Sequence, residues 1–430
     1  MRTVDLLILG ASQVVTVAPD AEAWGEDRPG PLAGTAMQDV GVLEDGAVAI
    51  HRGRIVAVGP TNEITKAYRG MRRVFARGRV VMPGFVDPHT HPVFAKFRED
   101  EFAQRCRGAD YEAILAAGGG IHASARALQG TPRAKLLSDL LPRLDRFLLH
   151  GTTLIEGKSG YGLTKASELR SLSVLRSADR QHPIDIVRTF LGAHAVPPDR
   201  RRRDYIREII DEMIPLVAER GLAEFCDVFV ERGAFTVPEA ERILRAARRH
   251  GLRAKVHADQ FRDGGGALLA AKMKAISVEH VDATGPAGIH ALHKAGTIPV
   301  LLPSASVFTG LRHLPNGRRF IDAGLPVALS TDFNPGTSPT ENQGLVASLA
   351  CSLLGMTPEE AVVAITRNAA AAIGREDEHG MLVPGHRANL VILDAPSYTF
   401  LPYRMGTNLV HAVVVRGRVV VRRGRIQNVK

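Results

Sequence analysis

Eight short apolar segments alternate with amphipathic stretches between residues 83 and 382, and this alternation limits the possible folds more than any other feature. Apolar runs of this length are typical of buried strands, and the stretches between them have the spacing of helices. Eight strands alternating with helices favour an α/β fold, a (β/α)8 TIM-like barrel, over a doubly wound sheet. The expected strands lie near residues 82–88, 152–157, 185–192, 225–231, 253–257, 275–280, 297–302 and 326–331.

Two of the expected helices have clear termini. One begins near Thr236, which forms a Thr-x-x-Glu capping box with Glu239, and it ends at Gly251. Another begins at Thr-Pro-Glu-Glu (357–360) and ends at Gly374. The chain has no Gly-x-Gly-x-x-Gly or Walker A motif where a nucleotide-binding fold would need one. These features favour the barrel further.

Both ends of the chain are rich in short strands. A hairpin signal, Arg-Gly-Arg at 52–54, recurs at 416–418, with glycine in each turn. We therefore expect one small β-sandwich domain built from both termini, residues 1–82 plus 383–430. The barrel, residues 83–382, is expected to be inserted between its two parts.

The composition indicates a protein with a large core and no membrane span. Of the 430 residues 45% are hydrophobic, and no apolar stretch approaches the roughly 20 residues of a transmembrane helix. Asp5 interrupts the apolar N-terminal run, which argues against a signal peptide. Cys106, Cys226 and Cys351 lie far apart, so a disulfide framework is disfavoured and a reducing cytoplasm is expected.

The net charge of +10 suggests an anionic partner. The basic residues are scattered among acidic ones, however, and the densest run, residues 200–203, leads into a helix as a solvated face does. We therefore expect no nucleic-acid and no membrane partner. The charge would attract small anionic substrates weakly.

The pair His89 and His91 follows the first expected strand. Residues i and i+2 of an extended chain project to the same side, so both imidazoles can face one point beyond the strand end. His257 and Asp332 follow two other expected strands, and the carboxyl ends of barrel strands share one face. Three imidazoles and a carboxylate suit Zn²⁺ or Fe²⁺ with room for a water, whose pKa the ion lowers towards ~7. Asp332 would then take the proton during attack, although a turn or helix-capping role explains the same residue.

Further polar residues follow other expected strands, and each also has a purely structural explanation. His280 would donate to a bound hydroxide or oxyanion, or is a hydrogen-bonded core histidine. Gln260, one helical turn past His257, would hold substrate by its amide or bond within a loop. Tyr161 lies in a glycine-flanked loop that would approach a ligand or simply turn, and His194 is similarly ambiguous. Arg98 would clamp a substrate carboxylate, or is an ordinary surface arginine.

Five segments together resemble the amidohydrolase superfamily and, within it, the imidazolonepropionase family, over essentially the whole chain. They read Pro-His-Thr-His (88–91), Lys-Ser-Gly-Tyr-Gly-Leu (158–163), Leu-Gly-Ala-His (191–194), His-Ala-Asp-Gln (257–260) and Thr-Asp-Phe-Asn-Pro-Gly-Thr-Ser-Pro-Thr-Glu-Asn (331–342). The His-x-His pair alone marks only the superfamily. The segments 158–163 and 331–342 are more specific, and together they select this family.

The resemblance implies a metal-dependent hydrolase with one divalent ion per chain, zinc or iron. The implied metal ligands are His89, His91, His257 and Asp332, and the implied substrate contacts are Arg98, Tyr161, His194, Gln260, Asn334, Gly336 and Thr337. We expect Asp332, His280, His194 and Gln260 to take part in catalysis. The implied reaction opens 4-imidazolone-5-propanoate to N-formimidoyl-L-glutamate, the third step of histidine degradation, and a homodimer is common among similar proteins.

One position departs from part of the family. Some members have Glu where this chain has Gln260. A glutamine cannot transfer a proton, so more of that duty would fall on Asp332 and His280.

Other functions remain open at this point. A related deaminase acting on a nitrogen heterocycle would keep the metal ligands but has less use for Arg98. A two-metal hydrolase typically carries a carboxylated lysine after the fourth strand, whereas residues 227–232 contain none. A barrel that serves only as a scaffold would be expected to have lost ligands, and a nucleic-acid-binding protein would show salt-sensitive binding.

Overall fold

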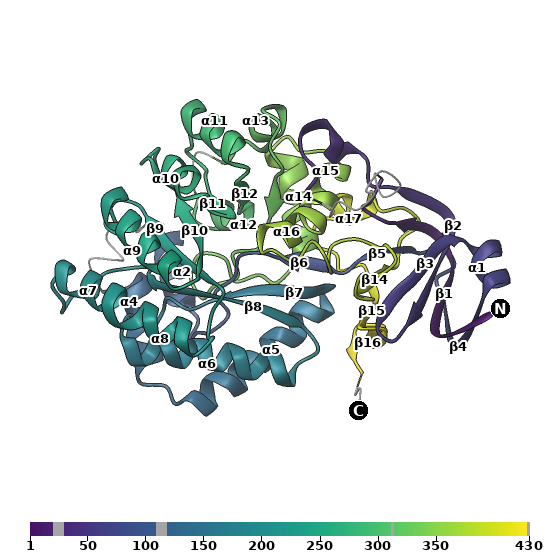
Figure 1. Ribbon diagram of the computed structural model, residues 1–430, viewed down its shortest axis with the longest axis horizontal. Helices are drawn as coiled ribbons and strands as arrows, with labels where there is room; N and C mark the ends of the chain where they lie inside the picture. Colours follow the sequence, from purple (N-terminus) through teal and green to yellow (C-terminus); the bar gives the residue numbers. More distant parts are fainter. Residues whose placement is uncertain (20–29, 109–117, 311–313, 428–430) are drawn as a thin grey trace.

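The computed structural model describes residues 1–19, 30–108, 118–310 and 314–427. In these ranges the chain forms two sheets (Figure 1). One is a parallel sheet surrounded by helices, and the other is a mixed sheet to which both ends of the chain contribute. The parallel sheet has the order β13-β12-β11-β10-β9-β8-β7-β6, so successive strands are neighbours. Its strands are β6 (Phe85–Asp87), β7 (Thr152–Lys158), β8 (Asp185–Ala193), β9 (Phe225–Val230), β10 (Arg253–Ala258), β11 (Ser277–His280), β12 (Ile298–Leu301) and β13 (Ala328–Leu329).

The first and last strands of this sheet approach each other and nearly close it. Thr90 and Phe333, just beyond β6 and β13, form a parallel bridge, and the His91 N–H donates to the Phe333 carbonyl at 2.8 Å. The Asp87 carboxylate also links the end of β6 to the segment after β13, because it accepts hydrogen bonds from the hydroxyls of Ser330 and Thr331. The prediction of a (β/α)8 TIM-like barrel is confirmed.

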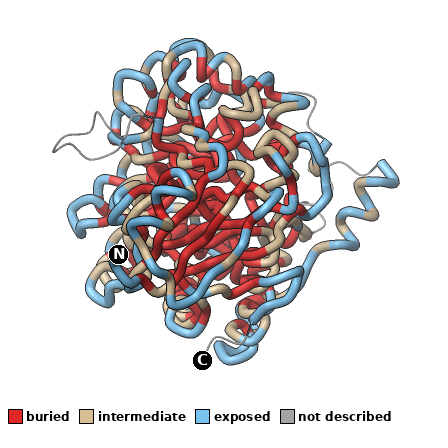
Figure 2. Tube along the Cα trace, turned by 90° about the vertical axis from the view of Figure 1, so that its right-hand side faces the viewer, coloured by how far each residue is buried: buried red, intermediate tan, exposed pale blue. Residues whose placement is uncertain are grey.

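Helices connect the barrel strands and cover the outside of the barrel, while buried residues fill its interior (Figure 2). Short helices also lie in the loops beyond the carboxyl ends of the strands, among them α2 and α12. The helical elements of this part are α2 (Glu99–Cys106), α4 (Gly120–Gln129), α5 (Arg133–Leu149), α6 (Lys165–Gln181), α7 (Arg202–Glu208), the π-helical turn η3 (Ile209–Met213), α8 (Ile214–Glu219), α9 (Val237–Arg249), α10 (Gly266–Met273), α11 (Pro286–Ala295), α12 (Pro303–Phe308), α13 (Gly317–Asp322), α14 (Gln343–Leu353), α15 (Pro358–Ala364) and α16 (Arg367–Ala372). In the described part of the chain, no helix is both long and apolar enough to span a membrane.

The mixed sheet combines strands from both ends of the chain, in the order β17-β16-β15-β14-β5-β1-β2-β3, with β4 pairing to β1. The central β1 pairs with β5, and β5 pairs with β14, so this sheet joins the two termini directly. Its elements are β1 (Arg2–Val15), η2 (Gly34–Gln38), β2 (Val42–His51), β3 (Arg54–Pro60), α1 (Thr61–Ala67), β4 (Tyr68–Phe75), β5 (Val80–Pro83), β14 (Leu390–Leu393), α17 (Phe400–Tyr403), β15 (Val410–Val415), β16 (Arg418–Arg422) and β17 (Arg425–Ile426). The boundaries 1–82 plus 383–430 and 83–382 stay a prediction.

The two Arg-Gly-Arg hairpins form as expected and lie against each other. Arg52 and Gly53 have φ of 51° and 75°, and Arg416 and Gly417 have φ of 47° and 73°, values typical of a two-residue hairpin turn. A Cβ built on Gly53 would lie 3.2 Å from the Arg416 carbonyl oxygen. The repeated signal therefore marks the place where the two terminal parts meet.

Two expected elements are each divided in the structure. The stretch 82–88 supplies the end of β5 to the mixed sheet and β6 to the barrel, and the chain changes sheets at Gly84, where a Cβ would lie 2.4 Å from Thr153 side-chain atoms. The helix expected from 357 to 374 is wrong as one helix, because α15 and α16 are separate. Thr366 breaks it with φ −127° and ψ −93°, and its hydroxyl donates to the Val362 carbonyl. The capping box at Thr236 and the helix α9 that follows it are confirmed.

Candidate active site

The His-x-His segment leaves β6 in an extended conformation and is held from both sides. The Arg143 guanidinium, on α5, donates to the carbonyls of Pro92 and Phe94 at 2.9 Å and stacks on the Phe94 ring. On the other side, the Ser330 hydroxyl donates to the His89 carbonyl at 2.8 Å. These contacts fix the backbone, so both imidazoles point into the barrel mouth.

The four expected ligands converge at one point. The Nε2 atoms of His89 and His91 are 3.3 Å apart, and Nε2 of His257 is 3.5 Å from that of His91. Asp332 Oδ1 lies 3.4 Å from His89 Nε2 and 3.6 Å from His91 Nε2. His89, His257 and His280 also form a set whose ligand atoms lie within 4.8 Å of one another. Side chains from β10, β11 and the segments after β6 and β13 thus share one site.

The electrostatics of this cluster fit a cation. Burial holds the pKa values of His89, His91 and His280 well below the usual range, so these rings are neutral and offer lone pairs. Burial also raises the pKa of Asp332 well above its usual value. Nε2 atoms this close need a proton or a cation between them, and a divalent ion with borderline-soft preferences matches three imidazoles and one carboxylate.

A buried carboxylate orients one of the imidazoles from behind. Asp227, on β9, places Oδ2 2.8 Å from Nδ1 of His257, and its other oxygen accepts from the His257 N–H at 3.2 Å. This contact leaves Nε2 of His257 facing the cluster. Such a carboxylate partner is the usual support of a metal-binding histidine.

Asp227 itself belongs to a buried ionic network under the site. Lys158 Nζ lies 2.7 Å from Asp227 and 2.9 Å from Glu156, and Lys255 Nζ lies 2.9 Å from Glu156 and 3.2 Å from Glu279. Burial alone would lower the pKa of Lys158, but the carboxylates of Asp227 and Glu156 raise it above its usual value. Lys158 is therefore an ammonium, unlike the carboxylated lysine that a two-metal hydrolase uses.

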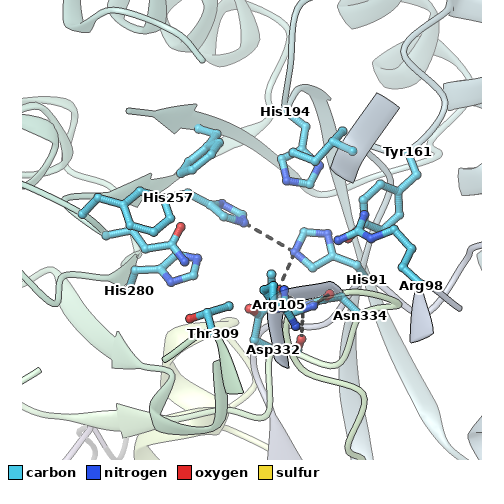
Figure 3. Close-up of a pocket in the computed structure, with 15 residues that line it drawn as sticks. His91, Arg98, Arg105, Tyr161, His194, His257, His280, Thr309, Asp332 and Asn334 are labelled. Carbon is cyan, nitrogen blue, oxygen red and sulfur yellow. Dashed lines mark hydrogen bonds and ion pairs between the residues drawn. The ribbon is translucent and has the colours of Figure 1, made fainter. Parts of the chain in front are cut away.

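A cavity of about 320 Å³ opens over the cluster. In Figure 3 the His91 ring lies between His257 on one side and Tyr161 and Arg98 on the other. Ten of the expected site residues line this cavity: His91, Arg98, Tyr161, His194, His257, Gln260, His280, Asp332, Asn334 and Thr337. His89 is fully buried beneath them, and Gly336 lies behind Arg98.

Arg98 is held at the edge of the cavity by several contacts. Its Nη1 donates to Ser124 Oγ at 2.9 Å, and its Nε lies 3.2 Å from Glu101. The guanidinium rests against Gly336, where a built Cβ would be 1.6 Å from Nη2. A glycine is needed at 336 because the arginine occupies the space of a side chain.

Two site residues differ in detail from expectation. Gln260 does not lie a helical turn past His257, because β10 ends at Ala258 and Asp259 has φ +51°. The Asp259 carboxylate holds this loop by accepting hydrogen bonds from the N–H groups of Gly264 and Gly266 at 3.0 Å.

Asn334 lines the cavity, but its side-chain amide forms hydrogen bonds within its own loop. It accepts from the Thr337 N–H at 2.7 Å and donates to the Asp332 carbonyl at 2.7 Å.

Five residues that line the cavity are not among those expected from the sequence: Arg105, Ile121, Phe229, Phe261 and Thr309. Arg105 had a detectable signal, because it lies seven residues after Arg98, two helical turns along α2. Its Nη2 donates to the Gly336 carbonyl at 3.3 Å, and its guanidinium lies 5.3 Å from the Phe308 ring centroid. A second guanidinium thus borders the cavity near Arg98.

Comparison with known families agrees with this arrangement. Residues 112–421 match the model of the amidohydrolase family, and residues 46–70 match that of the imidazolonepropionase-like composite domain of bacteria. The chain is 46% identical to the imidazolonepropionase of Geobacillus kaustophilus over 427 residues, which cover 98% of this chain and 99% of the relative. It is also 46% identical to that of Symbiobacterium thermophilum over 433 residues, covering 99% of this chain and 100% of the relative.

Solved structures share the fold at low sequence identity. Guanine deaminase from E. coli superposes with a TM-score of 0.73 at 16% identity and covers 97% of this chain and 99% of its own. A zinc-bound adenosine deaminase from Xanthomonas campestris has a TM-score of 0.72 at 18% identity, covering 100% and 95%. The full-length relatives and the match over most of the barrel decide the family. The chain belongs to the amidohydrolase family and, within it, to the imidazolonepropionases.

Proposed function

We propose that this protein hydrolyses the cyclic amide of 4-imidazolone-5-propanoate and releases N-formimidoyl-L-glutamate. One observation carries the proposal: a single cavity joins a cluster of metal-type donors to the guanidinium of Arg98. A substrate of this class has a cyclic amide at one end and a carboxylate at the other. The donor cluster suits the amide, and a guanidinium binds a carboxylate through paired hydrogen bonds.

The proposed reaction adds a water oxygen to the ring carbonyl carbon and breaks the ring C–N bond. A divalent cation held by His89, His91, His257 and Asp332 would lower the pKa of that water and polarise the carbonyl. The Asp332 carboxylate accepts the water proton and returns it to the departing nitrogen. His280 donates to the carbonyl oxygen as negative charge develops there, and its place in the wall of the same cavity as Asp332 suits this role.

The remaining residues bind and orient the substrate. His194 and Tyr161 lie beside His91, with ring centroids 5.2 Å and 5.6 Å from that ring. Gln260 and Thr337 offer neutral hydrogen-bonding groups at the cavity wall. The rings of Phe229 and Phe261 add apolar surface to the cavity wall.

Removal of the metal is expected to abolish turnover. The assay follows the ultraviolet absorbance of freshly generated imidazolone propionate after dialysis against a chelator, and readdition of zinc or iron should restore the rate. Metal analysis is expected to give one ion per chain. Full activity without metal would contradict the proposal, and two ions per chain would favour the two-metal hydrolases instead.

Ammonia release separates this reaction from that of a related deaminase. Ring opening to the formimidoyl product liberates no ammonia, whereas a deaminase releases it directly. We expect no ammonia while the imidazolone absorbance disappears. Stoichiometric ammonia from a purine or pyrimidine ring would replace the proposed function.

Gly336→Ala is expected to raise KM about tenfold with little change in kcat, as loss of uniform substrate binding does. The added Cβ would lie 1.6 Å from Arg98 Nη2, so the guanidinium must move away from the carboxylate. Steady-state kinetics measure the effect. Gly30→Ala is the matched control, because a Cβ there meets nothing within 4 Å. An unchanged KM in the Gly336 variant would remove Arg98 from carboxylate binding.

A further inference from the structure

Glu168 lies in the first turn of α6 and is fully buried, yet it does not line the cavity. Its carboxylate accepts three backbone N–H groups from the loop that follows β7. Gly160 donates to Oε2 at 2.8 Å, while Gly162 and Leu163 donate to Oε1 at 2.7 Å and 2.8 Å. One side chain therefore satisfies most of the amide groups of residues 159–163.

This loop has a backbone that needs such support. Gly160 has φ +110° and Leu163 has φ +51°, both in the region that favours glycine. A Cβ on Gly162 would lie 2.6 Å from the Glu168 nitrogen and 2.8 Å from Oε1. Gly162 thus leaves the space that Glu168 occupies. Buried N–H groups without an acceptor would be costly, so the loop geometry depends on Glu168.

The same loop positions two groups of the cavity. Tyr161 is part of it and lines the cavity wall. The Gly160 carbonyl accepts a hydrogen bond from His194 Nδ1 at 3.0 Å, which sets the orientation of that ring. His194 in turn stacks on His91 with an interplanar angle of 13°. A path of direct contacts therefore leads from Glu168 through Gly160 to the substrate-facing side chains.

We propose that Glu168 is a positioning residue that holds the 159–163 loop and, through it, sets Tyr161 and His194 for substrate binding. The inference rests on the proposed function for its kinetic consequences. The carboxylate is required because it is an acceptor at both oxygens. An amide of the same size would turn its NH₂ group against at least one backbone N–H, and the loop would rearrange.

The test compares Glu168→Gln with Glu360→Gln. Glu360 is a fully buried carboxylate in the first turn of another helix, α15, where it accepts the Thr357 N–H at 2.8 Å, remote from the cavity. We expect E168Q to raise KM roughly tenfold with kcat within about threefold and metal content unchanged, the pattern of lost substrate binding. E360Q should leave KM unchanged.

Two further measurements separate positioning from general stability. In E168Q, hydrogen exchange at the amides of Gly160, Gly162 and Leu163 should accelerate by about tenfold or more, and E360Q should leave those amides protected. This readout needs no turnover, so it stands even if the proposed function fails. In a Tyr161→Phe background, E168Q should raise KM less than it does alone, because both changes act through one loop.

The KM values and the exchange rates of the loop amides together decide whether Glu168 positions the loop. An unchanged KM and unchanged loop exchange in E168Q would overturn the proposal. Equal KM changes in E168Q and E360Q, or additive effects with Y161F, would assign Glu168 to general stability and overturn it as well. If E168Q does not fold, Glu168→Asp provides the same measurements, because its carboxylate is one methylene too short to reach all three donors.

Discussion

Asp332→Asn is expected to lower kcat by roughly 10³-fold or more while the barrel stays folded. The carboxylate lies 3.4 Å and 3.6 Å from the Nε2 atoms of His89 and His91, so it faces the place where the attacking water is activated. An amide has the same shape but cannot accept the water proton. It is also a weaker ligand than a carboxylate for a divalent ion, because it carries no charge.

Kinetics, metal content and thermal unfolding of the Asp332 variant should be measured together. Asp185→Asn is a suitable control, because Asp185 is a largely buried carboxylate at the start of β8, whereas His194 follows the other end of that strand. The partners of Asp185 include Arg387 and Arg416. That variant should keep its kcat. Near-normal kcat in a metal-loaded Asp332 variant would exclude Asp332 as the base.

The position of the candidate metal-ligand cluster could be predicted because it depends on regular backbone geometry. The i, i+2 spacing places His89 and His91 on one side of an extended segment, and the barrel brings the ends of β6, β10, β11 and β13 to one face. The convergence of His257, His280 and Asp332 on this pair could therefore be predicted without any knowledge of side-chain contacts. The fold, in turn, followed from the alternation of strands and helices alone.

The supporting contacts could not be predicted, because each depends on partners distant in the sequence or on a local break in regular structure. Lys158 meets Asp227 across 69 residues, and nothing in either local sequence indicates the pairing. The break at Thr366 results from a hydroxyl that bonds to its own helix, which the apolar period does not reveal. Glycines 160 and 162 indicated a close approach, but the approaching groups belong to the protein itself: His194 and Leu191 at Gly160, and Glu168 at Gly162.

The buried ionic network beneath the site affects the stability of the fold. Lys158, Glu156 and Asp227 are essentially excluded from solvent, and the ammonium is the group that joins the two carboxylates. Burial opposes charge on Asp227, but His257 and Lys158 together hold its pKa well below the usual value. Lys158 is thus one of the groups that keep Asp227 ionised.

Lys158→Met is expected to destabilise the protein by about 3–5 kcal/mol, because it leaves Asp227 buried without its lysine partner, while Glu156 keeps Lys255 at 2.9 Å. The Asp227 carboxylate should then have a folded-state pKa above its unfolded value, so the loss should be largest near neutral pH and shrink as pH falls and Asp227 takes up a proton. Denaturant unfolding at several pH values measures both effects. Lys165→Met is the matched control, because Lys165 pairs with Glu212 at the exposed start of α6 and its removal should leave the midpoint unchanged. A Lys158 variant as stable as the wild type at neutral pH would show that the Asp227 carboxylate finds another partner, and Lys255, already 2.9 Å from Glu156, would be the group to test next.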